Sequence, residues 1–129
     1  MQYSFKNMVR KMDIRPKTIF CDIDGTLIRH KPPGGLNKNS VELLDGTIEK
    51  LQDWDKKGYN IILTTGRKES LRDLTEKQLS SVGIFYDKLI MGIGGGVRVL
   101  INDLKREETF ETAIAINIIR NKGIKDVEI

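Results

Sequence analysis

Hydrophobic residues follow two spacings along this chain, and the two spacings alternate. Short continuous apolar runs are typical of strands buried in a parallel sheet, and they predict strands at 18–22, at 60–64, within 84–91 and at 97–101. Apolar residues three or four positions apart predict amphipathic helices at 45–58, 70–81 and 107–121. Because strands and helices take turns, we expect an α/β fold with a parallel sheet, in three layers with helices on both faces.

Glycine and proline residues mark where these elements end. Helix ends are expected at Gly58, Gly83 and Gly123. Asp45 is expected to cap the start of the first helix with its side chain. The run Pro32-Pro33-Gly34-Gly35 predicts that residues 28–40 are a loop, because these residues cannot sustain a strand ladder.

Composition and charge narrow the class of protein. The chain has 129 residues, of which 39% are hydrophobic and 31% charged, as in ordinary globular domains. We expect one domain at 17–129, with 125–129 as an edge strand, preceded by a basic extension at 1–16. The net charge is only +4, and the basic residues are scattered, without the aromatic interleaving that nucleic-acid binding uses, which argues against a nucleic-acid partner.

The single cysteine, Cys21, excludes an internal disulfide and suits a reducing compartment. It lies in a predicted buried strand, where we expect an inert core thiol. No apolar stretch approaches the roughly 20 residues that a membrane-spanning helix needs. The sequence therefore predicts a cytoplasmic protein without a membrane partner.

Polar side chains follow three of the predicted strands. They are Asp22 and Asp24, the segment 65–67, and Asn102-Asp103. Residues i and i+2 of a strand share a face, so the first two carboxylates are expected to project together and to repel unless a cation lies between them. Ligands of parallel sheets bind beyond the carboxyl ends of the strands, and this end therefore predicts a cation site.

These segments resemble the signatures of the haloacid dehalogenase-like (HAD) phosphohydrolases. The first signature is matched by Asp22-x-Asp24-Gly25-Thr26, the second by Thr65-Gly66-Arg67 and the fourth by Leu100-Ile101-Asn102-Asp103. A second copy of the letters, Asp45-Gly46-Thr47, lacks the preceding strand. The resemblance covers about residues 17–124 and is to capless members, which implies a Rossmann-like domain with no cap domain. In that superfamily residues 28–40 would form a flap over the site.

The resemblance implies a magnesium-dependent phosphomonoester hydrolase. Asp22 would attack phosphorus and form an aspartyl-phosphate, and Asp24 would act as general acid and base. Magnesium would be held by Asp22, by Asp24 through its main-chain carbonyl, and by Asp103. Thr65, Gly66 and Arg67 would bind the phosphate.

The third signature, a cation for the phosphate, has no clear match here. Lys88 is our first choice as this catalytic cation, and Arg98 is the second, as a substrate-binding residue. Where many members carry a second acid, this chain has Asn102, which would ligate through its carbonyl or only brace the site. His30, the only histidine, is expected in the solvent-exposed loop. The glycines at 92–96 are expected at the rim of the site, because they connect two strands and lack the dinucleotide-binding spacing.

Several functions stay open at this point. The favoured substrate is a phosphorylated sugar or similar small metabolite, hydrolysed by a homo-oligomer, and the resemblance includes sugar-acid phosphatases of polysaccharide synthesis. The alternatives are a phosphotransferase and a catalytically weak HAD domain with a binding or regulatory role. A nucleic-acid end phosphatase is less favoured because the charge is modest.

Overall fold

The computed structural model describes residues 14–31, 40–104 and 111–129. The chain divides into two units. One comprises residues 16–95 and 117–129 and contains all the described helices and strands. The described part of the other is 14–15, 96–104 and 111–116. Most of the predicted extension at 1–16 lies outside the described residues, so that prediction stays a prediction.

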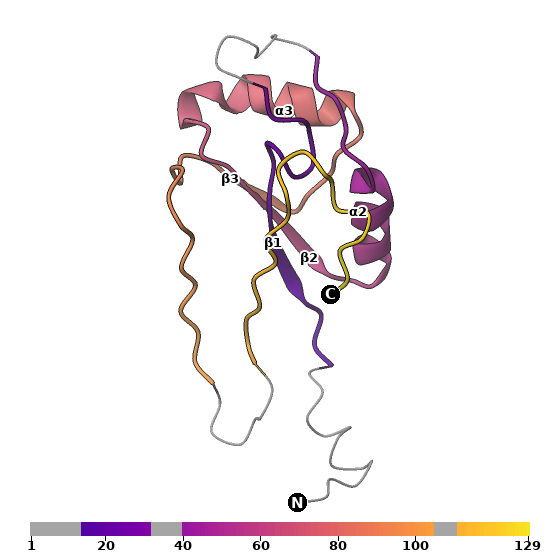
Figure 1. The fold of residues 1–129 in the computed structure, drawn as a ribbon, viewed down its shortest axis with the longest axis vertical. Helices are drawn as coiled ribbons and strands as arrows, with labels where there is room; N and C mark the ends of the chain where they lie inside the picture. Colours follow the sequence, from indigo (N-terminus) through magenta and orange to yellow (C-terminus); the bar gives the residue numbers. More distant parts are fainter. Residues whose placement is uncertain (1–13, 32–39, 105–110) are drawn as a thin grey trace, which may run out of the picture. The chain divides into compact units, whose positions relative to one another are not determined.

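Three parallel strands form one sheet in the first unit (Figure 1). They are β1 (Thr18–Asp22), β2 (Asn60–Thr64) and β3 (Lys88–Ile90), in the order β1-β2-β3. The register aligns Asp22 with Thr64, and Thr64 with Ile90. The carboxyl ends of all three strands therefore meet at one edge, and the predicted α/β fold with a parallel sheet is confirmed.

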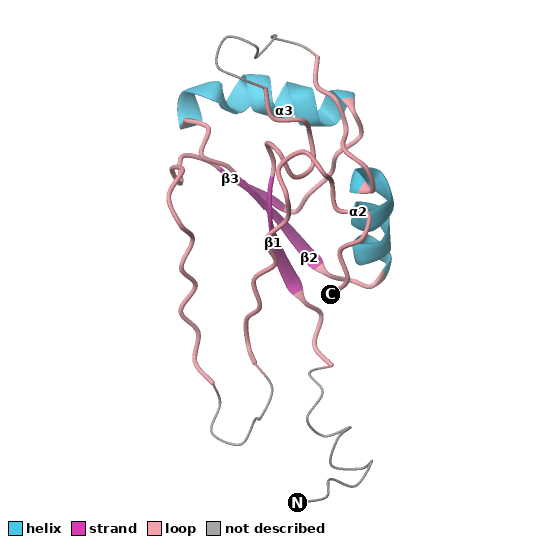
Figure 2. Cartoon of the chain, viewed as in Figure 1, coloured by secondary structure: helices cyan, strands magenta, loops and turns pink. Residues whose placement is uncertain are grey.

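Two helices connect the strands, as Figure 2 shows. They are α2 (Thr47–Lys56) and α3 (Arg72–Ser81), the latter preceded by a short 3-10 turn at Glu69–Leu71. Gly58 and Gly83 follow these helices with φ angles of 75° and 82°, the left-handed conformation that ends a helix. The predicted cap at Asp45 is wrong, because the N-cap is Gly46 at φ 85° and no side chain caps it.

One face of the sheet is the core. Cys21, Leu63 and Leu89 are aligned across the three strands and are all buried. Leu51 and Trp54 of α2 and Leu79 of α3 belong to the same cluster. On the other face, Phe20 is 55% exposed and Ile90 is 40% exposed. The expected homo-oligomer stays a prediction.

The chain after residue 95 departs from the predicted pattern. No strand occupies 97–101, where Val97 is 93% exposed and Ile101 is 88% exposed. A strand requires a hydrogen-bonded ladder of main-chain groups. In this segment Arg98 and Asn102 instead donate from their side chains, Asn102 Nδ2 to the carbonyl of Thr112. A run of β-branched residues alone therefore did not make a strand.

The predicted helix at 107–121 is also wrong for its described part. Residues 107–110 lie outside the described residues, and 111–119 adopt no helix. In this stretch Ile114, Ile116 and Ile118 alternate with smaller or polar residues, which is a period of two. Such a pattern favours an extended chain. The predicted edge strand at 125–129 is likewise absent.

The last described segment is attached to the start of α2. The carbonyl of Asp45 accepts hydrogen bonds from the N–H groups of Ile124 at 2.9 Å and Lys125 at 3.0 Å. Gly123 has φ 90°, and a Cβ there would lie 2.5 Å from the Asp45 oxygen. Ile124 is buried in the core. Among the described residues, no helix has the length and apolar character of a membrane span.

Candidate active site

A tight turn ends β1 and positions the two aspartates. The carbonyl of Ile23 accepts hydrogen bonds from the N–H groups of residues 26, 27 and 28, at 3.1, 2.9 and 3.2 Å. Gly25 takes φ 87°, and a Cβ there would lie 3.1 Å from Cγ of Arg120. The turn therefore needs a glycine for both its conformation and its space.

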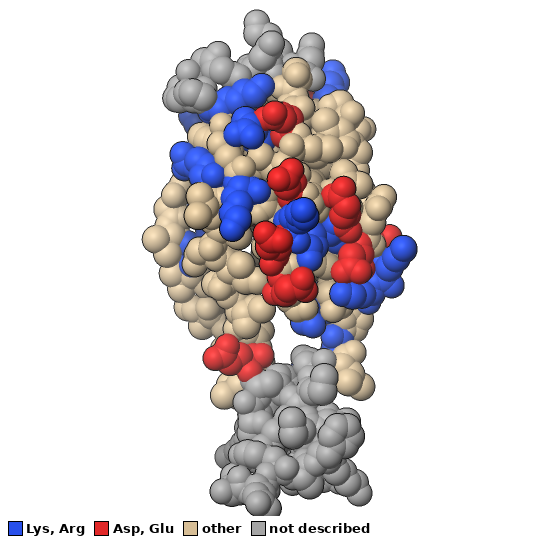
Figure 3. Space-filling view, turned by 45° about the vertical axis from the view of Figure 1, so that its right-hand side comes forward, with Lys and Arg blue, Asp and Glu red and all other residues tan. Residues whose placement is uncertain are grey.

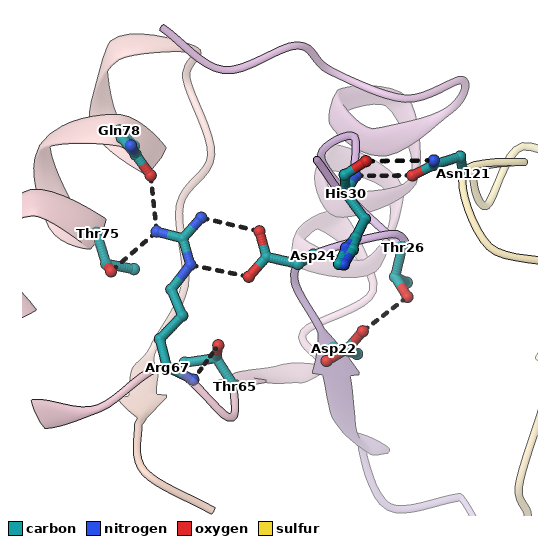
Figure 4. A network of polar contacts seen from close by, with 9 residues as sticks. All are labelled: Asp22, Asp24, Thr26, His30, Thr65, Arg67, Thr75, Gln78 and Asn121. Carbon is teal, nitrogen blue, oxygen red and sulfur yellow. Dashed lines mark hydrogen bonds and ion pairs between the residues drawn. The ribbon is translucent and has the colours of Figure 1, made fainter. Parts of the chain in front are cut away.

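Asp22 is the last residue of β1 and is exposed at the edge of the sheet. Its Oδ2 accepts a hydrogen bond from Thr26 Oγ1 at 3.1 Å (Figure 4). The hydroxyl is supplied by the turn itself, so the same backbone that ends the strand orients the carboxylate. Asp22 is thus oriented by the turn and is exposed at the surface.

Asp24 is held by a buried arginine. Arg67 donates from Nε to Oδ2 and from Nη2 to Oδ1 of Asp24, both at 2.8 Å. The Arg67 side chain is 7% exposed and that of Asp24 is 30% exposed. This fork-to-fork pairing joins the ends of β1 and β2 and is the strongest geometry available to such a pair.

The remaining donors of Arg67 reach α3. Its Nη1 donates to Thr75 Oγ1 at 3.0 Å and to Gln78 Oε1 at 2.7 Å, and both partners are buried. Its backbone N–H donates to Oγ1 of Thr65 at 3.0 Å. Figure 4 shows Arg67 between α3 and the turn after β1. Arg67, predicted to bind phosphate, therefore binds side chains of the protein in this structure, and the Thr65 hydroxyl accepts a hydrogen bond from its main chain.

The glycine loop lies at the rim of the site, as predicted. The N–H of Gly92 donates to the carbonyl of Arg67 at 2.7 Å, and that of Ile93 to the carbonyl of Thr65 at 3.3 Å. A Cβ on Gly66 would lie 2.9 Å from the carbonyl oxygen of Gly94. Gly66 therefore lets two backbones approach closely beside Arg67.

Asn121 closes the turn from the other side. Its backbone N–H donates to the carbonyl of Gly25 at 2.8 Å, and its Oδ1 accepts from the N–H of His30 at 2.7 Å. It has φ 66°, and it is the one non-glycine residue of the described ranges with positive φ. Asparagine tolerates that conformation better than most residues do. The C-terminal segment thus supports the aspartate turn directly.

Replacing Asn121 should separate these two contributions to stability. Asn121→Gly keeps the backbone conformation and loses the side-chain bonds, so we expect a loss of about 1–2 kcal/mol. Asn121→Ala adds the strain of the left-handed conformation, about 1 kcal/mol more. Urea unfolding of both variants measures the difference. Equal stability of the alanine and glycine variants would contradict the backbone part of this account.

The loop after the turn begins as two antiparallel arms. Ile28 and Leu43 form an isolated antiparallel bridge, and the N–H of Arg29 donates to the carbonyl of Glu42 at 2.9 Å. Residues 32–39, the remainder of the expected flap, lie outside the described residues. His30 is partly buried, not fully exposed as predicted.

A small pocket of about 120 Å³ opens beside Asp24. Its lining residues come from both arms of the loop, from the arginine and from α3: Asp24, Ile28, Arg29, His30, Lys31, Ser40, Val41, Arg67 and Gln78. A larger hollow lies on the surface of α3 and is lined by Asp73, Glu76, Lys77, Ser80 and Ser81. It contains none of the site residues, so the small pocket is the one that matters here.

The predicted magnesium ligands are only partly present in the first unit. Across the described residues, no group of three or more His, Cys, Asp or Glu side chains could hold a metal. At this turn the candidate oxygens are the Asp22 carboxylate and the main-chain carbonyl of Asp24, since both carboxylate oxygens of Asp24 accept hydrogen bonds from Arg67. Magnesium commonly takes one or two carboxylates together with waters and substrate phosphate, so this donor set fits it.

The other predicted site residues are not brought to this turn by any described contact. Lys88 is the first residue of β3 and is aligned with Ile62 of β2, two residues before Thr64, which is aligned with Asp22. Within the described ranges Lys88 makes no ion pair. Arg98 and Asp103 belong to the second unit. Arg98 donates to the carbonyl of Gly96 there, and Asp103 accepts from Thr112 through its own carbonyl at 2.9 Å. Their proposed roles, and that of Asn102, stay predictions.

Cys21 is an inert core thiol, as expected. Burial raises the pKa of the Cys21 thiol to about 12, and the negative charge of Asp22 adds to this rise. An unfolded cysteine titrates near 8.5, so about 10³-fold less thiolate forms at pH 8 in the folded protein. The protonated thiol favours folding fully below pH ~8.5, and this contribution is lost as the pH rises toward 12.

We therefore expect a disulfide reagent to label the folded protein roughly 10³-fold more slowly at pH 8 than in denaturant. Time courses of labelling with and without urea measure this ratio. Fast labelling of the folded protein at pH 8 would contradict the burial of Cys21.

Three residues of the site were missed from sequence alone: Thr75, Gln78 and Asn121. Thr75 and Gln78 are polar side chains on the buried face of α3, together with Leu71, Leu79 and Val82. Polar residues on an apolar helix stripe are a readable signal of an internal polar partner. No local signal identified Asn121, because its partners lie about 90 positions earlier.

Comparisons with known proteins agree with this geometry. A family model described as haloacid dehalogenase-like hydrolase matches residues 19–122. No curated protein matches the chain. A solved Pnkp1/Rnl/Hen1 complex contains a chain that is 31% identical, with a TM-score of 0.54, over 65% of this chain and 30% of that one.

Two further structures are similar. A chain of a Pnkp1/Rnl/Hen1 RNA repair complex is 33% identical, with a TM-score of 0.52, over 59% of this chain and 25% of that one. A structural genomics target from Vibrio cholerae is 20% identical, with a TM-score of 0.50, over 67% of this chain and 79% of that one, which supports the fold alone. The chain thus spans less than a third of the two more similar proteins.

Proposed function

Because the chain belongs to the haloacid dehalogenase-like hydrolase family, we propose that it is a magnesium-dependent phosphomonoester hydrolase acting through an aspartyl-phosphate. One observation carries the proposal. Two aspartates leave the end of β1 in one turn, with Asp22 exposed and Asp24 held by Arg67. Unequal environments of this kind allow paired carboxylates to take different roles.

In the proposed reaction, Asp22 is the nucleophile. An oxygen of its carboxylate attacks phosphorus, the bond to the alcohol oxygen of the substrate breaks, and that oxygen takes a proton from Asp24. Water then attacks the aspartyl-phosphate and gives its proton to Asp24. The phosphorus–Asp22 bond breaks, and inorganic phosphate leaves. Each oxygen of Asp24 that faces Arg67 keeps another lone pair for this proton.

Magnesium would be held by the Asp22 carboxylate, by the main-chain carbonyl of Asp24 and by Asp103. Bound there, it would neutralise phosphate charge and so lower the repulsion that opposes attack by a carboxylate. We propose Lys88 as the cation that neutralises the phosphate, with Arg98 as the second choice. Thr65, through its hydroxyl, and Gly66 would bind the phosphate.

The proposed substrate is a phosphorylated sugar or similar small metabolite. The net charge is only +4, and the face in Figure 3 carries acidic side chains among the basic ones. A polynucleotide chain is usually bound by a continuous basic surface. The single cysteine supports a cytoplasmic location, since it suits a reducing compartment.

Release of inorganic phosphate tests the proposal. The purified protein is incubated with phosphorylated sugars, sugar acids and nucleotides, with magnesium or with a chelator. We expect turnover that needs magnesium and is restored by adding it back. Product analysis with added alcohols detects a phosphotransferase, and no turnover of any substrate by folded protein would favour a non-catalytic domain.

A second candidate is phosphate removal from RNA ends. It is favoured by one observation, the 31% and 33% identity to chains of complexes that include an RNA repair complex. An RNA oligonucleotide with a terminal phosphate, placed in the same assay, tests it. If kcat/KM for that oligonucleotide is far above that for every small phosphate, RNA ends are the substrate and the small metabolite is not.

A further inference from the structure

Gln78 carries a buried donor that no described residue uses. The residue is 1% exposed, and its Nε2 is the one buried side-chain nitrogen or oxygen of the described residues without a hydrogen-bond partner. A buried amide nitrogen without a partner costs about 1–3 kcal/mol. Such a cost is expected where the donor serves a molecule that binds.

The direction of this amide is fixed by Arg67. A guanidinium only donates, so the oxygen of Gln78 must face Arg67 Nη1, as it does at 2.7 Å. Flipping the amide would place two donors against each other. The nitrogen must therefore point away from Arg67, and Gln78 lines the pocket beside Asp24.

The pocket is polar, and of the three cations that line it, Arg29, Lys31 and Arg67, two are paired with carboxylates. Asp24 is paired with Arg67, and Arg29 is paired with Glu42. Ile28 and Val41 form the apolar part of the pocket wall. Its volume of about 120 Å³ equals that of roughly four waters, which is room for a short polyol. A hydroxylated group suits these walls, because its oxygens accept hydrogen bonds and its carbons contact Ile28 and Val41.

We propose that Gln78 determines substrate specificity, donating a hydrogen bond from Nε2 to an oxygen of the alcohol part of the substrate. This inference rests on the proposed function, in which Asp24 protonates the leaving alcohol and so must lie beside it. The pocket next to Asp24 is then the place for that alcohol. The substrate class becomes polyol or sugar phosphates, with a hydroxyl or carbonyl oxygen near the phosphate-bearing carbon.

A matched pair of substrates tests the role. Glycerol 3-phosphate carries hydroxyl oxygens and propyl phosphate does not. A site built to bond a hydroxyl rejects the analogue that lacks it, so we expect the wild type to favour glycerol 3-phosphate roughly 10²-fold in kcat/KM. Gln78→Glu keeps an oxygen for Arg67 and removes the donor, and it should abolish most of this preference, measured as the ratio of the two kcat/KM values within the same variant. Gln52→Glu, on the exposed surface of α2, is the matched control.

A second measurement does not depend on turnover. Glycerol, titrated into the wild-type protein, should shift the NMR signal of the Gln78 side-chain amide, and 1-propanol should not. That shift without any hydrolysis would reject the proposed function and keep the binding role. No selective shift, or an equal loss for both phosphates in Gln78→Glu, would show that Gln78 only holds Arg67 or a water, and would overturn the proposal.

Discussion

Asp22→Asn should lower the rate of phosphate release by roughly 10³-fold or more, because the substitution removes the attacking oxygen and leaves the shape of the site unchanged. Thr26 can still donate to the remaining side-chain oxygen, so the turn after β1 should persist. We expect the free energy of unfolding to stay within about 0.5 kcal/mol of the wild-type value. Initial rates at saturating magnesium, measured on the best substrate, give the ratio.

Asp55→Asn is the matched control for this experiment. Asp55 is an exposed acid on α2, and it should retain full activity when changed in the same way. Similar rates for Asp22→Asn and the wild type would mean that Asp22 is not the nucleophile. A loss of rate in both variants would point to an effect of charge on the whole protein.

Arg67→Met should destabilise the protein by about 3–5 kcal/mol, the largest effect on stability that we expect from a single residue. The substitution leaves the partly buried carboxylate of Asp24 without its cation and removes the donor that Thr75 and Gln78 share. Arg67→Lys restores the charge but not the fork, and should recover only part of the loss. Urea unfolding at pH 7 measures both variants.

The contribution of the pair itself follows from a double-mutant cycle with Asp24→Asn. We expect a coupling free energy of about 1–3 kcal/mol. The control is Arg72→Met, since Arg72 forms surface ion pairs with Glu69 and Glu76 and should contribute about 1 kcal/mol or less. If Arg67→Met cost no more than Arg72→Met, the buried network would not be a main support of the fold.

The sheet was predictable because its signals are local and agree with each other. The strand at 60–64 has the predicted bounds, and the glycines after α2 and α3 end them as expected. In each case the apolar period, the helix stop and the burial of the element point to the same structure. The position of Asp22 follows directly, since it is simply the residue at which β1 ends.

The region after residue 95 and the role of Arg67 were not predictable in this way. The apolar residues of 111–119 fit both the spacing of a helix and the alternation of an extended chain. Which of the two forms depends on packing partners that a sequence does not show. Arg67 follows a strand, as a phosphate ligand would, but its contacts with Thr75 and Gln78 depend on how α3 packs. Contacts between distant elements decide a residue's role, and a motif gives only its position.

The attachment of Asn121 to the turn at Gly25 has a consequence for synthesis of the protein. Asn121 is made well after β1 and β2, so the aspartate turn cannot reach its final form until the chain has grown past residue 121. A nascent chain that already contains every residue of the sheet would then still lack the contacts with Asn121 that support the aspartate turn. Phosphatase activity should therefore appear only in chains that extend past residue 121, and ribosome-bound chains of increasing length should show it as a step.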